Sequence, residues 1–320
     1  MLSSYYPQPN AHANVPDMPA WQPDPQERVL ILAPHPDDET LAVGGLIASM
    51  TSGHASPHIR VIVATNGDAS YLTAITAGGR RAFTRRNFQN LAAVRQQESM
   101  NALTSLGLDS EQIRFWGFPD RGLGAIWRRY WGANRPYRSP TTGYRRAKQA
   151  VNSPVLPFTG ASLIELFQNE LGEFQPTTVI LPHPQDAHPD HRFLAYFTLF
   201  SIALHQKRAA HAPPKLLAFQ MWQNKFQIKE AGAALAGYLF GSDASPKRQY
   251  LPFSSDIREQ KAQALQCYAS QKWAAGPLLR KATRNDYEVF SLLQPDSFGI
   301  EQPGALRPAP TQLVVPSPIC

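Results

Sequence analysis

Cysteine is scarce in this chain of 320 residues, which contains only Cys267 and Cys320. A zinc site built from cysteines is excluded by this count, because such sites use several thiolates. A structural disulfide is not expected between a cysteine in an apparent helix and one at the last position. So few cysteines are typical of a reducing compartment, and we expect a cytoplasmic location.

Long apolar runs are also missing. No stretch of about 18 or more apolar residues occurs, so we expect no membrane span. The start of the sequence lacks a basic region followed by an apolar run, the pattern of a secretory signal. Residues 1–26 are rich in Pro, Asn and Ala, and we expect an extended or disordered arm there. Residues 301–320 have the composition of a Pro-rich tail.

Acidic residues are fewer than basic ones, 24 against 31, which gives a formal net charge of +7. Two interpretations stay open: scattered solvated charge, or attraction to anionic partners. Nothing that resembles a nucleic-acid motif accompanies the basic residues, so we predict no nucleic-acid partner. Much of the excess lies in two groups of residues: Arg80, Arg81, Arg85, Arg86 and Arg128, Arg129, Arg145, Arg146, Lys148.

Among the features that are present, an acidic cluster after an apolar run stands out. The run Val29–Leu32 has the length and composition of a strand buried on both faces, and it stops at Pro34. His35, Asp37, Asp38 and Glu39 follow, before a small and apolar stretch that predicts a helix. An acidic helix cap is the simpler interpretation. Adjacent carboxylates repel unless a cation is near, however, and His with Asp suits zinc.

A second cluster follows another apolar run, residues 179–181. His183, His188, Asp190 and His191 come within the next ten positions. Catalytic zinc typically takes three protein ligands and keeps one position open. His35 and Asp38 would supply two ligands, and either His188 or His191 would supply the third.

The order of elements predicts an α/β fold. Strand-like runs at 29–32, 59–65, 113–118, 179–181 and 216–222 alternate with helical patterns. Such alternation indicates a Rossmann-like, mostly parallel sheet with helices on both faces and an active site at the carboxyl ends of the strands. We expect one domain over residues 27–300. An insertion rich in aromatic residues and Arg interrupts it at about 123–158, where it either contacts substrate or covers apolar surface.

The two clusters together resemble the signature of the LmbE-like, or PIG-L, deacetylases. The resemblance covers roughly positions 27 to 272. Members of this family are zinc enzymes that remove acetyl groups from N-acetylglucosamine-type amides. The resemblance implies one Zn²⁺ per chain, held by His35, Asp38 and His191, with Asp37 as the general base.

The family pattern and the spacing of the second cluster suggest roles for two further residues. We expect a cationic His188 to stabilise the oxyanion of the reaction. Asp190, two residues on, would hold His188 protonated and oriented.

Substrate contacts follow from the same resemblance. Arg95 and Glu98 match an Arg-x-x-Glu pair of the family, which makes Arg95 a ligand for substrate hydroxyls or phosphate. The alternative is a surface ion pair on a helix, worth about 0.3–0.5 kcal/mol. Asp120 matches an Asp that contacts sugar hydroxyls, although an ordinary Asp turn is the alternative. Tyr268 stands where the family usually has His, so we expect only a structural role for its helix.

Three functions of different classes therefore remain. The first is zinc-dependent deacetylation of an N-acetylated amino sugar or its conjugate. The others are metal-dependent phosphoester hydrolysis and sugar binding with a vestigial metal site. The expected partner is a small-molecule N-acetyl sugar or glycoconjugate, and homo-oligomers are left open.

Overall fold

The computed structural model describes residues 18–24, 26–52, 58–71, 73–74, 83–132, 134–208, 212–222, 247–272 and 276–293. Within these ranges the chain forms a sheet in the order β3-β2-β1-β4-β5-β7-β6. The first five strands of the sequence pair in parallel, whereas β7 runs antiparallel to both β5 and β6. The predicted mostly parallel α/β fold is confirmed. The strands are β1 (Val29–Ala33), β2 (Ile59–Thr65), β3 (Ile113–Phe118), β4 (Thr178–Pro182), β5 (Lys215–Phe219), β6 (Arg248–Pro252) and β7 (Tyr287–Leu293).

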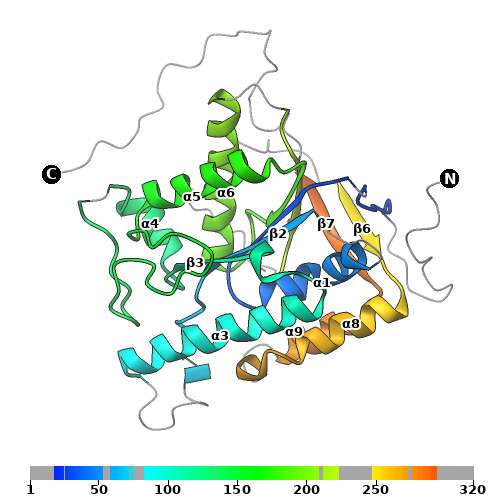
Figure 1. Ribbon diagram of the computed structural model, residues 1–320, viewed down its shortest axis with the longest axis horizontal. Coiled ribbons are helices and arrows are strands. Elements are labelled where there is room, and N and C mark those ends of the chain that lie inside the picture. The colour runs from blue at the N-terminus through cyan, green and yellow to red at the C-terminus, as the bar shows by residue number, and fades with distance from the viewer. Residues whose placement is uncertain are drawn as a thin grey trace.

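Helices cover both faces of the sheet. Figure 1 shows α1, α3, α8 and α9 on one side and α4, α5 and α6 on the other. Searched over the described residues, the helices include none that is long and apolar enough to cross a membrane. The helices are α1 (Asp38–Thr51), α3 (Arg85–Ser105), α4 (Leu123–Arg129), α5 (Gly160–Phe174), α6 (Pro189–Arg208), α8 (Ser255–Leu265) and α9 (Gly276–Ala282), with short 3-10 helices η2 (Ser110–Gln112) and η3 (Ala269–Gln271).

Strand β1 lies in the middle of this arrangement and separates two apolar cores. Its side chains alternate: Ile31 and Ala33 belong to the core beneath α1 and α8, and Leu30 and Leu32 to the core beneath α5 and α6. All five residues of the strand are at most 1% exposed. This two-sided burial explains why the strand appears in the sequence as a continuous apolar run.

The connections from β1 define where a site can form. Strand β2 pairs with one edge of β1 and β4 with the other. The order of the strands therefore reverses between β1 and β4, which leaves an opening beyond their carboxyl ends. The two His- and Asp-containing clusters predicted from the sequence follow these two strands.

Part of the expected arm is ordered against the sheet. The backbone N–H of Trp21 donates to the carbonyl of Tyr250 in β6, at 2.7 Å, and the N–H of Tyr250 donates to Pro19 at 3.1 Å. The Trp21 side chain is only 6% exposed. The chain around Trp21 is thus anchored to β6, and residues 1–17, like 301–320, lie outside the described ranges.

The aromatic insertion folds back onto the sheet. It begins as α4, and its later part pairs with β3 through two backbone hydrogen bonds between Val151 and Phe115, at 2.9 and 3.0 Å. Thr141 donates to Asp68, which follows β2, at 2.5 Å. The insertion therefore reaches the carboxyl ends of the strands, where the site lies.

Helix α1 contains a break that two distant residues repair. The backbone of Val43 is non-helical, with φ −136° and ψ 16°. The N–H groups of Gly45 and Leu46 donate to the carboxylate of Glu288 in β7, at 2.7 and 3.0 Å. Lys261 of α8 donates to the carbonyl of Leu41 at 2.9 Å and to Glu288 at 2.7 Å. The side chains of this buried ion pair thus supply the hydrogen-bond partners that the backbone groups lose where the helix is broken.

We expect Lys261→Met to destabilise the fold by about 3–5 kcal/mol, because Glu288 would keep a buried charge without its cation. Urea unfolding would measure this as a lower midpoint. Arg258→Met on the same helix is the control, because Arg258 is 39% exposed in its ion pair with Asp286. That variant should lose about 1 kcal/mol or less, and equal losses in the two variants would contradict the prediction.

Candidate active site at the carboxyl edge of the sheet

Acidic and imidazole side chains that follow four parallel strands lie close together beyond the carboxyl ends of those strands. His35 follows β1, Asp68 follows β2, and Asp120 follows β3. His188 follows β4, and His191 lies in the first turn of α6. Because the carboxyl ends of parallel strands point the same way, segments far apart in the sequence become neighbours here.

The Asp38 carboxylate is the meeting point of the two predicted clusters. Its Oδ2 lies 3.0 Å from Nδ1 of His35 and 3.1 Å from Nε2 of His191. The same oxygen accepts the backbone N–H of His35 at 3.1 Å. The structure thus brings together the three residues that were predicted to hold a metal ion.

The outward nitrogens of both imidazoles face further carboxylates. His35 Nε2 lies 3.3 Å from Asp120 and 3.3 Å from Asp190. His191 Nδ1 lies 3.4 Å from Asp186. Each imidazole therefore has one nitrogen toward Asp38 and the other toward a second carboxylate, the pattern by which carboxylates orient metal-binding histidines.

Asp186 was not among the predicted site residues. Its carboxylate accepts the N–H groups of Met221 and Trp222, at 2.9 and 3.1 Å, and that of His188 at 2.9 Å. It therefore fixes the loop after β4 and also contacts His191. The only signal in the sequence was its place inside the His-rich stretch.

Burial and charge together set the protonation of this cluster. Burial alone would lower the pKa of His191, but Asp38 and Asp186 raise it to about 9. The carboxylates of Asp120, Asp190 and Asp38 likewise overcome burial and raise the pKa of His35 well above its ordinary value. Burial would raise the pKa of Asp38, whereas His191 and His35 hold it well below its usual range. Without a metal ion, the two histidines are cations that neutralise the carboxylates.

His188 differs from the role predicted for it. Burial, with the His35 and His191 cations nearby, lowers the pKa of His188 to about 3. The ring is therefore neutral, not cationic. It lies beside His35, with ring centroids 4.7 Å apart, so its position in the site is retained.

Asp190, which was expected to support His188, lies against His35 in the structure. Asp190 is fully buried and accepts the backbone N–H groups of Arg121 and Leu123, at 2.5 and 3.2 Å, besides facing His35. These contacts turn the carboxylate toward the first cluster. Asp190 therefore orients His35 instead of His188.

Asp37, the predicted general base, lies beside the cluster in an unusual backbone conformation. It has φ 135°, a positive value that is rare for residues other than Gly. Its carboxylate is 3.2 Å from Nη2 of Arg95. Burial raises the pKa of Asp37 to about 7, and Arg95 opposes that rise. A base with a pKa near neutral suits proton transfer at physiological pH.

Arg95 does not form the surface ion pair that was the alternative interpretation. Its side chain is buried, and its terminal nitrogens donate to the carbonyls of Gly67 and Pro36, at 2.8 and 2.7 Å. Glu98, its expected partner, accepts instead from the backbone and side chain of Ser270. Arg95 thus supports the Asp37 loop from behind.

The donor set fits a metal ion. Ligand atoms of His35, His188 and His191 lie within 4.8 Å of one another, as do those of His35, Asp120 and Asp190. Both ring nitrogens of His191 are buried and have no well-aligned hydrogen-bond partner among the described residues, although carboxylates are close. Imidazole nitrogens and carboxylate oxygens in this arrangement are typical zinc ligands.

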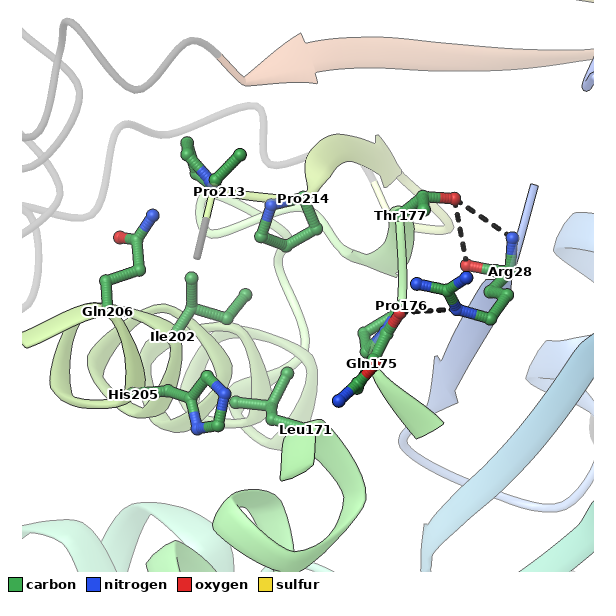
Figure 2. A pocket seen from close by; sticks show the side chains of 11 residues that line it. Arg28, Leu171, Gln175, Pro176, Thr177, Ile202, His205, Gln206, Pro213 and Pro214 are labelled. Atoms are coloured by element: carbon green, nitrogen blue, oxygen red, sulfur yellow. Dashed lines mark hydrogen bonds between the residues drawn. The ribbon is translucent and has the colours of Figure 1, made fainter. Parts of the chain in front are cut away.

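A separate pocket lies at the other end of the sheet, next to the amino ends of the strands. Figure 2 shows its lining, which includes Arg28, Thr177 and Pro214, the residues just before β1, β4 and β5. Its volume is about 370 Å³. None of the site residues line it, so it is not part of the candidate active site.

The structure thus defines an α/β domain with a potential metal site, made of His and carboxylate side chains at the point where the strand order reverses. Residues 30–200, more than half of the chain, match the model of the family PIG-L, GlcNAc-PI de-N-acetylase. The chain belongs to this family. Among curated proteins, none matches it.

Solved structures share the fold at low sequence identity. N,N′-diacetylchitobiose deacetylase from Pyrococcus horikoshii has a TM-score of 0.51 and 18% identity, over 88% of each chain. A deacetylase of teicoplanin biosynthesis has a TM-score of 0.51 and 18% identity, over 83% of this chain and 97% of its own. 4-Carboxy-2-hydroxymuconate hydratase from Pseudomonas putida KT2440 has 0.51 and 15%, over 84% and 95%. These likenesses show the fold alone, because one fold hosts different reactions.

The buried His183 predicts a pH dependence of stability. Burial lowers its pKa from 6.5 to about 4, so between these values the unfolded chain binds a proton that the folded chain does not. Stability should fall as the pH drops through this window, by up to about 3 kcal/mol for a shift of this size. Urea unfolding of metal-free protein at several pH values would measure it.

His183→Asn removes this titration and keeps an acceptor for the N–H of Gln185, which His183 Nδ1 accepts at 3.1 Å. The variant should lose less stability than the wild type between pH 6.5 and 4. The same change at the exposed His58 is the control and should leave the pH dependence unchanged. Identical pH dependence in wild type and His183→Asn would refute the assignment.

Proposed function

We propose that this protein is a zinc-dependent hydrolase that removes the acetyl group from an N-acetylated amino sugar or its conjugate, and releases acetate and a free amine. The observation that carries the proposal is the convergence of His35 and His191 on Asp38, in a chain of the PIG-L family. The substrates named for the deacetylases of the same fold support the choice of an acetylated sugar or glycoconjugate.

We assign one zinc ion per chain to His35, Asp38 and His191. His188 is the rival third ligand, because one of its ring nitrogens lies within 4.8 Å of ligand atoms of both His35 and His191. The orientation of the rings favours the first set: both histidines face Asp38 with one nitrogen and a carboxylate with the other. Asp120, Asp186 and Asp190 then hold the ligands in place.

A zinc ion in this position would lower the pKa of water to about 7 and polarise the amide carbonyl. Asp37 takes the proton of the attacking water, since it is adjacent to the ligand Asp38 and has a pKa near neutral. The neutral His188 donates a hydrogen bond to the oxyanion, as a neutral imidazole can. Asp37 then returns this proton to the leaving amine, since the neutral His188 has no acidic proton to give.

Asp120 is the proposed acceptor for a sugar hydroxyl. It lies within 3.3 Å of His35, and its other oxygen accepts the N–H of Ala69 at 3.0 Å. A hydroxyl that reaches Asp120 would lie next to the proposed metal ion. Nothing comparable supports a substrate contact by Arg95, whose terminal nitrogens are engaged by the protein.

Assays of zinc-loaded protein on a panel of N-acetylated amino sugars and phosphate esters test the reaction class. We expect acetate and free amine from at least one N-acetyl sugar, loss of this activity with a chelator, and its return with zinc. Phosphate release without acetate release would instead establish the phosphoesterase. Binding of sugars without turnover of any panel member would establish a binding module.

Single substitutions separate the proposed roles. Asp37→Asn and His188→Ala should each lower kcat on the order of a hundredfold or more, with zinc content unchanged. Asn is a suitable replacement for Asp37, since it tolerates positive φ. His191→Ala should lose the zinc, as measured by metal analysis of purified protein. Full zinc content in His191→Ala, or near-normal kcat in either of the others, would be incompatible with these roles.

A further inference from the structure

The backbone of Asp37 has to be held in place. With φ 135° and ψ −32°, it occupies a region that side-chain-bearing residues rarely adopt. Such conformations cost free energy and persist only where the surrounding structure enforces them. The contacts on either side of this residue therefore determine where its carboxylate points.

Two buried side chains provide those contacts. Arg95 donates to the carbonyl of Pro36, just before the strained residue, at 2.7 Å. Glu39 accepts the backbone N–H of Asp37 itself, at 3.0 Å from Oε2. Glu39 thus closes a short loop over two residues, and its side chain has to be fixed for this loop to keep its shape.

Glu39 is fixed by residues from two other parts of the chain. Its Oε1 accepts two hydrogen bonds. One comes from Ser99 Oγ of α3, at 2.5 Å, and the other from the hydroxyl of Tyr268, just before η3, at 2.6 Å. The Tyr268 hydroxyl also lies 2.7 Å from Thr40 Oγ1, so both neighbours of the phenol are oxygens. Glu39, Ser99 and Tyr268 are all fully buried.

We infer that Glu39, Ser99 and Tyr268 are positioning residues for Asp37. Ser99 and Tyr268 hold the Glu39 carboxylate, and Glu39 holds the N–H of Asp37, so that the base keeps its strained backbone and its carboxylate stays beside Asp38. This inference rests on the proposed function, in which Asp37 takes the proton of the attacking water. It assigns a role to Tyr268, a residue for which the sequence indicated only structure.

Tyr268→Phe and Ser99→Ala each remove one donor to Glu39 without removing its bond to Asp37, and the double variant removes both. We expect kcat to fall with each variant and about 10–100-fold in the double, with unchanged KM and zinc content. The controls make the same changes away from the site. They are Tyr250→Phe at a half-buried position of β6, and Ser201→Ala in α6, where the buried hydroxyl has no partner in the part of the chain that the structure describes. A lower unfolding temperature with kcat at the wild-type level would overturn the inference.

Crystal structures of the wild type and the double variant decide the point independently of any substrate. We expect the Asp37 φ to leave the positive region, or its carboxylate to move away from Arg95, in the variant alone. An unchanged Asp37 in the double variant would overturn the inference. If the wild type releases no acetate from any N-acetyl sugar, the proposed function fails, and the structures still establish whether these residues position Asp37.

Discussion

The site depends on a balance of buried charge around His35. Three carboxylates, those of Asp38, Asp120 and Asp190, lie within 3.3 Å of its two ring nitrogens, and all are nearly inaccessible to solvent. Carboxylates buried so close together repel one another and require cations. Protons on His35 and His191 serve in the metal-free protein, and a divalent ion would replace them, because imidazole binds metals only when neutral. The rest of the structure delivers these groups to one point and screens them from water.

The part of the site that the sequence could predict is the part that follows strand order. His35 and Asp38 could be grouped with a histidine of the second cluster because each cluster comes after a continuous apolar run, and β1 and β4 are parallel neighbours. The choice of His191 over His188 came from the resemblance to the PIG-L family. The neighbouring Asp37 follows from the same turn. The positions of these residues could be predicted because each directly follows a strand, and the order of the strands then places them next to one another.

The remaining contacts could not be read in this way, because they depend on where a side chain points after packing. Arg95 and Glu98 have the spacing of a helical ion pair, yet they reach Pro36 and Ser270 respectively. Asp190 is two residues from His188 in the sequence but faces His35 from the start of α6. Strand β7 was also not predicted from the sequence, because Glu288 places a charge inside it. The structure explains this charge, since Glu288 pairs with Lys261 and accepts hydrogen bonds from the broken turn of α1.

The repair of α1 by Lys261 and Glu288 has a consequence for how the chain is made. The helix begins at the metal-ligand candidate Asp38, but its broken turn is completed by residues more than 200 positions later in the sequence. The family match ends at residue 200, so the matched segment contains neither partner. During synthesis on the ribosome, these hydrogen bonds of α1 can form only after β7 has emerged. Asp38 is therefore translated long before the residues that complete its helix.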